Sequence, residues 1–331
     1  MTRWWQGDDA AVTVRASDNP PMHLLIPCAS TLSDAGLPAL RGLALPHLQR
    51  LLPRMTPGDR LGSDEYSLST PAEQAHARLL GWQAPDGCLP WAAHAAAADG
   101  VATGDAAWGL LTPVHWHVGA EHVSVGYPDS LHLSAQESQA LFEAVRPLFD
   151  GEGWQLAWGS PMRWYASHDS LDGLPTASLD RVIGRNLDLW MGSHPQARLI
   201  RRLQNEVQML LYQQPLNDHR AGIGALPVNS FWLSGCGRAQ PAADSAGLVI
   251  DGRLRAPLLG EDWSDWAEAW RALDAGPLRT LLERHDAGAP VSLTLCGERF
   301  AQRFDAQPQG WLARVARRFG GSAPAAVLEA L

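Results

Sequence analysis

The sequence contains no lysine, so all 26 of its basic residues are arginine. This absence excludes mechanisms that need a lysine side chain, such as a Schiff base, the lysine of a P-loop or the lysine of a protein kinase. The 35 acidic residues outnumber the basic ones and give a formal net charge of -9. Because nucleic-acid binding needs clustered cations to neutralise phosphates, we expect no nucleic-acid partner.

The sequence also lacks long apolar runs and has only four cysteines, Cys28, Cys88, Cys236 and Cys296. Since a membrane helix needs about 20 consecutive apolar residues, we expect no membrane span. The cysteines form no Cys-x-x-Cys pair, which argues against a zinc knuckle or a disulfide framework. The first residues show no basic segment followed by an apolar stretch, so we expect a cytoplasmic location.

Length and composition suit a globular protein, since 331 residues with 46% hydrophobic and 18% charged side chains can bury a sizeable core. Residues 1–21 are polar and end in two prolines, which predicts a flexible N-terminal tail and leaves the translation start open between Met1 and Met22. We expect residues 22–331 to form one α/β domain. An inserted strand-rich subdomain around 106–170 is an open alternative within it.

Helical and strand-like patterns alternate through much of the chain, which predicts an α/β fold with a three-layer, mixed or mostly parallel sheet. The expected helices cover residues 43–55, 72–80, 134–145, 193–214, 263–273 and 311–319. The expected strands cover residues 24–26, 153–158, 162–166, 228–233 and 291–295, with two more within 106–125. Trp263, Trp266 and Trp270 recur at helical spacing, which favours a core-facing helix over a stacking platform for bases or sugars.

A histidine cluster is the sharpest local signal in the strand-rich region. His115 and His117 are two residues apart, so on a strand their side chains face the same side, and His122 follows shortly after. Imidazoles arranged in this way can share a divalent metal ion, manganese or zinc. The same histidines can instead be satisfied by backbone carbonyls in a packed hairpin, and a His-x-His pattern alone does not decide between the two.

A glycine-rich segment, Gly235-Cys236-Gly237, follows the expected strand 228–233. Such a loop can turn backbone N–H groups toward an anion or hold a reactive cysteine. A tight turn explains the glycines equally well, so both interpretations stay open. The sequence has no Gly-x-Ser-x-Gly context around Ser230 or Ser234, and we therefore predict no hydrolase nucleophile.

Two stretches resemble the archaeal-type, cofactor-independent phosphoglycerate mutases of the alkaline phosphatase superfamily. Residues 215–220 and 224–237 are similar to that family's Asn-x-x-Arg, Pro-x-Asn and Gly-x-Gly segments. Residues 24–27 and 45–52 resemble its first strand and its Pro-Asn-Leu-x-x-Leu helix. The chain as a whole, above all residues 228–237, also resembles the bacterial RpfE-type regulatory proteins.

The resemblance implies an alkaline phosphatase-like fold and phosphorylated small molecules as ligands. The residues that it implies as ligand contacts are Asn217, Arg220, Asn229, Ser234, Gly235 and Gly237. The catalytic set of the family is incomplete here. Its first strand ends in a metal-binding Asp, whereas this sequence has Pro27 and Cys28 at that place, and its late Asp-His pair has no counterpart near Cys296 and Glu298.

A two-metal phosphoryl-transfer site needs several carboxylates and imidazoles, so the resemblance implies a scaffold that has lost its metals. The leading hypothesis is a ligand-binding or regulatory pseudoenzyme with no catalytic residue and no required cofactor. Its partner would be a phosphorylated small molecule or a regulatory protein. One alternative is an active metal-dependent phosphomutase or phosphatase rebuilt around His115, His117 and His122. Another is an interaction module that uses exposed tryptophans.

Overall fold

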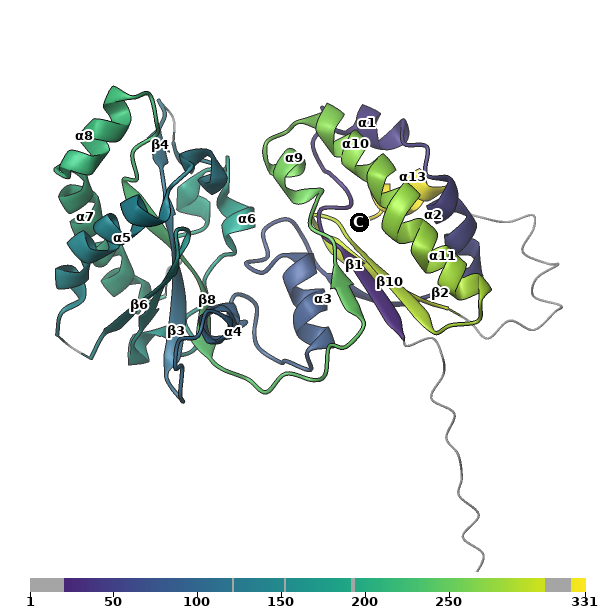
Figure 1. The fold of residues 1–331 in the computed structure, drawn as a ribbon, viewed down its shortest axis with the longest axis horizontal. Helices are drawn as coiled ribbons and strands as arrows, with labels where there is room; N and C mark the ends of the chain where they lie inside the picture. The colour runs from purple at the N-terminus through teal and green to yellow at the C-terminus, as the bar shows by residue number, and fades with distance from the viewer. Residues whose placement is uncertain (1–20, 121, 152, 192–193, 307–322) are drawn as a thin grey trace, which may run out of the picture.

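The computed structural model describes residues 21–331 except 121, 152, 192–193 and 307–322. It consists of two lobes that lie side by side, each built on a sheet of its own (Figure 1). Within the described residues, no helix is long and apolar enough to cross a membrane.

The first lobe contains a mixed five-stranded sheet. In spatial order its strands are β2 (Met55–Gly62), β11 (Phe300–Ala306), β10 (Val291–Cys296), β1 (Met22–Ile26) and β9 (Leu248–Ile250). Strand β1 runs parallel to both of its neighbours, β10 and β9, whereas β11 runs antiparallel to β10 and β2. The parallel strands β1 and β10 therefore end at the same edge of the sheet.

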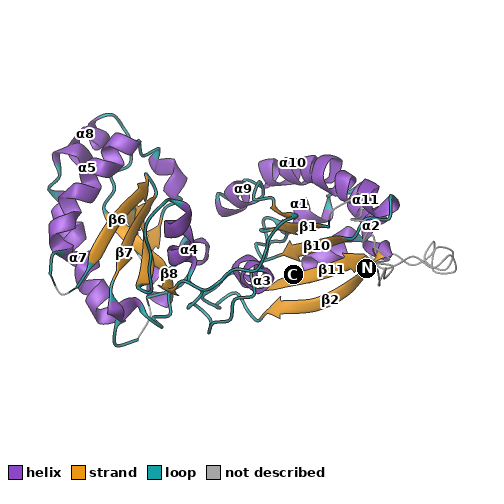
Figure 2. Ribbon diagram, turned by 60° about the horizontal axis from the view of Figure 1, so that its bottom comes forward, coloured by secondary structure: helices purple, strands orange, loops and turns teal. Residues whose placement is uncertain are grey.

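One face of this sheet carries most of the helices of the lobe (Figure 2). These helices are α1 (Leu37–Arg41), α2 (Pro46–Leu51), α9 (Arg255–Leu259), α10 (Trp263–Leu273), α11 (Arg279–Asp286) and α13 (Pro324–Glu329). Leu24 and Ile26 of β1 belong to the core beneath them, together with Trp266 and Trp270. The tryptophan stripe is thus confirmed as a core-facing helix.

The opposite face of the sheet is covered by α3 (Pro71–Leu79). Leu25 points to this side because successive residues of a strand alternate between the two faces, and it packs with Ala75 of α3 and Cys296 of β10. The core on this face is small, which leaves room for cavities along α3.

The second lobe contains an antiparallel four-stranded sheet. Its order is β6 (Gln155–Ser160), β7 (Arg163–Ser167), β3 (Ala107–Val114) and β8 (Ser230–Arg238). Helices α5 (Ala135–Val145) and α7 (Ala197–Tyr212) pack on one face and α4 (Trp91–Ala98) on the other (Figure 2). A hairpin of β4 (Trp116–Val118) and β5 (Val123–Val125) follows the end of β3.

Several short helices connect these elements. They are α6 (Leu179–Val182), α8 (Pro215–Gly222), the 3-10 helices η1 (Leu52–Arg54), η2 (Pro128–Leu131), η3 (Arg146–Phe149), η4 (Asp169–Leu171) and η5 (Leu187–Leu189), and the π-helix η6 (Asp274–Leu278). The α/β class predicted from the sequence is confirmed. The sequence left open an inserted strand-rich subdomain around 106–170. The sheet of the second lobe also includes β8, which lies well after this region in the chain.

Local signals fix the start of two helices. The predicted helix 72–80 is α3, which begins after Thr70, with Pro71 in its first turn and a capping box between Thr70 and Glu73. The predicted helix from Ser134 is α5, which has the same capping box with Glu137. In both cases the cap side chain accepts a backbone N–H that the helix itself cannot satisfy.

Other boundaries differ from the prediction. The expected helix 43–55 is divided, because Pro53 cannot continue the α-helical hydrogen bonding, and Met55 already begins β2. Residues 234–237 are not a loop after a strand but belong to β8 itself. The tail 1–20, the cap Ser193 and the expected helix 311–319 lie outside the described residues.

Candidate functional site

A cavity of about 400 Å³ lies where β1 and β10 end and meet the second lobe. Cys28 after β1 and Glu298 after β10 line it from the first lobe, and Arg181 and Arg185 line it from the second. Ligands of α/β proteins bind preferentially in the crevice outside the carboxyl ends of parallel strands. This interlobe cleft is therefore the candidate functional site.

Cys28 lies in the turn that follows β1. Its φ of 58° lies in the left-handed region that residues with a β-carbon rarely adopt. The indole N–H of Trp266 donates to the Cys28 carbonyl oxygen at 3.1 Å and holds the turn. Burial raises the pKa of the Cys28 thiol, and the nearby charge of Asp180 raises it further. The thiol therefore stays protonated, which makes it a poor nucleophile.

Arg181 is a deeply buried charge in the wall of the cleft, with 2% of its surface exposed. Its Nη1 donates to the Glu298 carbonyl at 2.7 Å, and its Nη2 donates to the Ser67 hydroxyl at 2.7 Å. Among the described residues it forms no ion pair with a carboxylate, and its buried Nε has no hydrogen-bond partner. Burial lowers the pKa of the guanidinium, as does the neighbouring charge of Arg185.

Two ion pairs join the lobes beside Arg181. Arg185 Nη2 lies 3.2 Å from Glu298 Oε2. Arg255 of α9 binds the Asp180 carboxylate with two hydrogen bonds, of 2.8 Å from Nε and 2.5 Å from Nη2. These charges are balanced within the protein, which leaves Arg181 as a cation whose counter-charge is not supplied by a direct contact.

The first turn of α3 brings a carboxyl group close to the cleft, because Thr70, Pro71 and Ala72 line the cavity. Burial raises the pKa of Glu73 to about 7, although hydrogen bonds from Thr70 partly oppose this shift. The Thr70 hydroxyl donates to Glu73 Oε2 at 3.1 Å. A carboxyl group that changes its charge close to neutral pH thus lies near the cleft.

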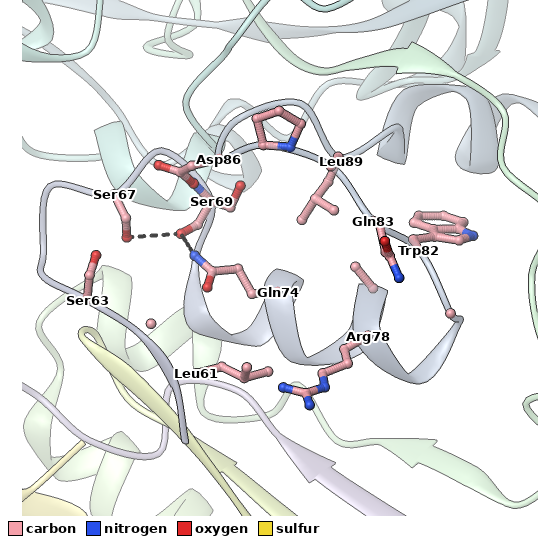
Figure 3. A pocket seen from close by; sticks show the side chains of 15 residues that line it. Leu61, Ser63, Ser67, Ser69, Gln74, Arg78, Trp82, Gln83, Asp86 and Leu89 are labelled. Carbon is pink, nitrogen blue, oxygen red and sulfur yellow. Dashed lines mark hydrogen bonds between the residues drawn. The ribbon is translucent and has the colours of Figure 1, made fainter. Parts of the chain in front are cut away.

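A larger cavity, of about 680 Å³, runs along the side of α3. Figure 3 shows Gln74 of α3 pointing toward Ser69, whose carbonyl oxygen it contacts at 3.2 Å. Arg181 does not line this cavity, but its Nη2 binds Ser67 and Ser69, which do. The charged residues that line the cavity already have partners: Asp86 accepts the backbone N–H groups of Leu68 and Ser69, and Arg78 pairs with Asp59.

Two of the residues predicted from the resemblance connect parts of the second lobe. The amide of Asn217 donates to the carbonyls of Leu211 and Val228, both at 2.8 Å. Arg220, with 2% of its surface exposed, pairs with Glu137 at 2.6 Å and donates to the Leu226 carbonyl at 3.0 Å. Neither residue lines the interlobe cleft. Their role as ligand contacts stays a prediction.

Asn229 and the glycines of β8 also have contacts within the lobe. The Asn229 side chain accepts the N–H of Trp116 at 2.7 Å and donates to its carbonyl at 3.0 Å. Ser234 is a buried residue of β8 paired with β3. Gly235 has a φ of 65°, and a β-carbon there would lie 2.9 Å from the backbone nitrogen of Ala92. Gly237 faces Pro90 in the same way, so these glycines let α4 approach the strand closely.

The predicted histidines lie around the β4–β5 hairpin. His115 follows β3, His117 is in β4, and their ring centroids are 4.5 Å apart. His122 is exposed and precedes β5. Within the described ranges, no group of three or more His, Cys, Asp or Glu side chains is placed to hold a metal ion.

The sequence did not identify the charged residues of the cleft. Asp180, Arg181 and Arg185 belong to a short segment without a recognisable motif, and Glu298 follows a strand far away in the chain. Charged residues in short connecting segments are usually solvated, so their pattern alone gives no signal. Only the approach of the two lobes brings them together.

Comparisons with known proteins give distant similarities of fold. No family model and no curated protein matches the chain. The chain is similar to the cofactor-independent phosphoglycerate mutase from Thermoplasma acidophilum DSM 1728, with 15% identity over 93% of this chain and 98% of that chain and a TM-score of 0.36. It is also similar to the PH0037 protein from Pyrococcus horikoshii, with 14% identity over 92% and 91% and a TM-score of 0.47.

Proposed function

We propose that this protein binds a small phosphorylated molecule in the interlobe cleft and acts through that binding, as a regulatory pseudoenzyme. The observation that carries the proposal is Arg181, a buried cation at the cavity wall whose hydrogen bonds end on carbonyl and hydroxyl oxygens. A phosphate group would supply the negative charge that no described carboxylate gives it directly. Arginine is suited to this role because it stays charged when buried.

The size and position of the cleft support the same ligand class. A cavity of about 400 Å³ suits a small molecule rather than a polymer. Arg185 is the second cation at its wall, and it now shares its charge with Glu298. A ligand phosphate that approached Arg181 would compete with Glu298 for Arg185, so binding would loosen one of the contacts between the lobes.

The residues at the strand ends support binding without metal-dependent phosphoryl transfer. Pro27 and Cys28 follow β1, and Gly297 and Glu298 follow β10. A two-metal mechanism needs several carboxylate and imidazole ligands at one place. The cleft is lined by three carboxylates, and two of them, Asp180 and Glu298, are paired with Arg255 and Arg185. We therefore propose that the protein requires no metal in this cleft. The cytoplasmic location, the relation to RpfE-type proteins and a regulatory protein partner stay predictions.

Titration calorimetry with 3-phosphoglycerate and with inorganic phosphate tests the proposal. Arg181→Gln should weaken binding of either probe at least tenfold. Arg238→Gln, which changes an exposed arginine outside the cleft, should leave it unchanged. Equal affinities for the wild type and Arg181→Gln, or no binding by the wild type, would show that the proposed site is wrong. Turnover of phosphoglycerate with manganese or zinc would instead favour the active metal-dependent enzyme.

A further inference from the structure

The β4–β5 hairpin carries a pair of imidazoles that the proposed function does not use. His115 lies between β3 and β4, and His117 lies within β4. Their ring centroids are 4.5 Å apart and their planes are inclined by 67°. His115 is half-buried, whereas His117 is exposed, so the pair is open to solvent on one side.

The tautomer of His115 is set by the backbone. Its Nδ1 lies 2.7 Å from the Pro227 carbonyl oxygen, which can only accept, so Nδ1 carries the proton and Nε2 keeps its lone pair. A neutral imidazole nitrogen with a free lone pair is the group that binds metal ions. A carbonyl bonded to the far nitrogen is also the usual support of a metal-binding histidine.

His117 owes its position to the absence of a side chain at Gly126. A β-carbon at Gly126 would lie 2.9 Å from His117 Nε2 and 3.3 Å from its Cδ2. The backbone around this glycine is fixed, because its N–H donates to the His115 carbonyl at 2.9 Å. Glycine at this position thus leaves the space that the second imidazole occupies.

We propose that His115 and His117 form a two-imidazole site for a transition-metal ion of the zinc, nickel or copper type, with water in its remaining positions. An ion about 2.1 Å from one nitrogen of each ring, with an angle of about 90–110° between the two bonds, holds the ring centres about 4.6–5.3 Å apart. The observed 4.5 Å lies at the short end of this range, next to the value for ligands at 90°. Imidazole selects these metals over manganese, which prefers oxygen ligands.

The bound ion would tie the end of β3 to the hairpin. His122 is not needed for the site, since the register pairs His117 with Ser124 and Val118 with Val123, and His122 lies beyond these pairs. The inference is independent of the interlobe cleft, because none of these residues lines it. Since an ion that binds the folded state alone stabilises it, metal should also raise the melting temperature.

Titration of the untagged protein with Zn²⁺ and Ni²⁺, followed by calorimetry and thermal unfolding, tests the site. His117→Ala should weaken binding at least tenfold and abolish the rise in melting temperature. His115→Gln should do the same, while its amide can still donate to Pro227. His219→Ala removes an exposed histidine of α8 and should leave both measurements unchanged.

Gly126→Ala gives a sharper test, because it removes no metal ligand. Its methyl group should displace the His117 ring and weaken binding several-fold, while the far-UV circular dichroism stays that of the wild type. Unchanged affinity in Gly126→Ala or His117→Ala would overturn the proposal, as would a wild type that binds neither Zn²⁺ nor Ni²⁺. Binding of Mn²⁺ as tight as that of Zn²⁺ would overturn the assignment of the metal class.

Discussion

The interior of the second lobe and the interlobe cleft each contain an arginine with 2% of its surface exposed, Arg220 and Arg181. Arg220 lies 2.6 Å from the Glu137 carboxylate and also donates to the carbonyls of Leu226 and Leu131. Arg181 binds carbonyl and hydroxyl oxygens and, among the described residues, no carboxylate. Within the described part of the chain, one buried charge is in direct contact with a carboxylate and the other is not.

This difference separates a charge that holds the fold together from one that can receive a ligand. Arg220 connects α8 to the first turn of α5 and to the chain before β8, so its hydrogen bonds point into the lobe. Arg181 lines the interlobe cleft and retains an unpartnered Nε. Burying a charge without a counter-charge costs free energy, and a bound anion would recover part of that cost.

Arg220→Ala should have the largest effect on stability. It leaves Glu137 without its partner and two carbonyls without a donor, so we expect the free energy of unfolding to fall by about 3–5 kcal/mol. Urea denaturation measures this change. A loss below about 1 kcal/mol would contradict the claim that Arg220, unlike Arg181, holds the fold together.

The variant Gly235→Ala tests whether the glycines of β8 contribute to the stability of the fold, as Arg220 does. Its β-carbon would lie 2.9 Å from the Ala92 nitrogen and 3.0 Å from the Trp91 β-carbon, at a φ of 65°. The combined clash and backbone strain should reduce the free energy of unfolding by about 2–3 kcal/mol. Gly222→Ala is the control, since a β-carbon at Gly222 meets nothing within 4 Å. Equal stabilities of the two variants would contradict the packing role.

Arg181→Gln should reduce stability less than Arg220→Ala does, but it should strongly weaken the binding of phosphate. The glutamine amide can replace part of the hydrogen bonding, so we expect about 1–2 kcal/mol loss in stability. The tenfold or greater loss of phosphate affinity corresponds to about 1.4 kcal/mol or more of binding free energy. Measuring both quantities on one preparation distinguishes ligand binding from folding. A variant that loses stability as Arg220→Ala does, yet keeps its affinity, would remove the distinction.

Acid should weaken the first lobe through two half-buried histidines, His23 and His76. Burial, with Arg303 for His23 and His94 for His76, lowers both pKa values from 6.5 to about 4. Below pH 6.5 the unfolded chain therefore binds more protons, and stability falls as the pH drops toward 4. After solvent screening we expect about 1 kcal/mol for each histidine.

The variant His76→Gln isolates this effect, because the change in its pH dependence relative to the wild type reports His76 alone. Glu73 acts in the opposite direction: with its pKa raised to about 7, its contribution is complete below pH 4.5 and is lost as the pH rises through 7. Urea denaturation at pH 7 and pH 4.5 gives the comparison. Identical stability differences between the variant and the wild type at both pH values would exclude His76 as the cause.

Several elements follow from local chemistry and were predictable from the sequence. The Thr70 and Ser134 caps, each followed three residues later by glutamate, place the starts of α3 and α5. The spacing of Trp266 and Trp270 identifies the buried face of α10. The edge strands were less accessible to prediction, because β2 is mostly exposed and contains a proline and a glycine.

The functional region was less predictable than the fold class. The resemblance directed attention to Asn217, Arg220 and Asn229, whose polar groups prove to bind backbone atoms within the second lobe. Arg181 gave no signal, because an arginine in a short polar segment is ordinarily solvated. Its burial depends on Glu298 and Ser67, which lie more than a hundred residues away in sequence.

By itself the sequence determined the α/β class, the capped helices and the core-facing tryptophans, since each of these depends on residues close together in the chain. The tertiary structure alone decided which buried arginine has a carboxylate partner and where the charged cleft lies. Burial and ion pairing depend on distances between segments that are remote in sequence, and these distances exist only once the two lobes have formed and met.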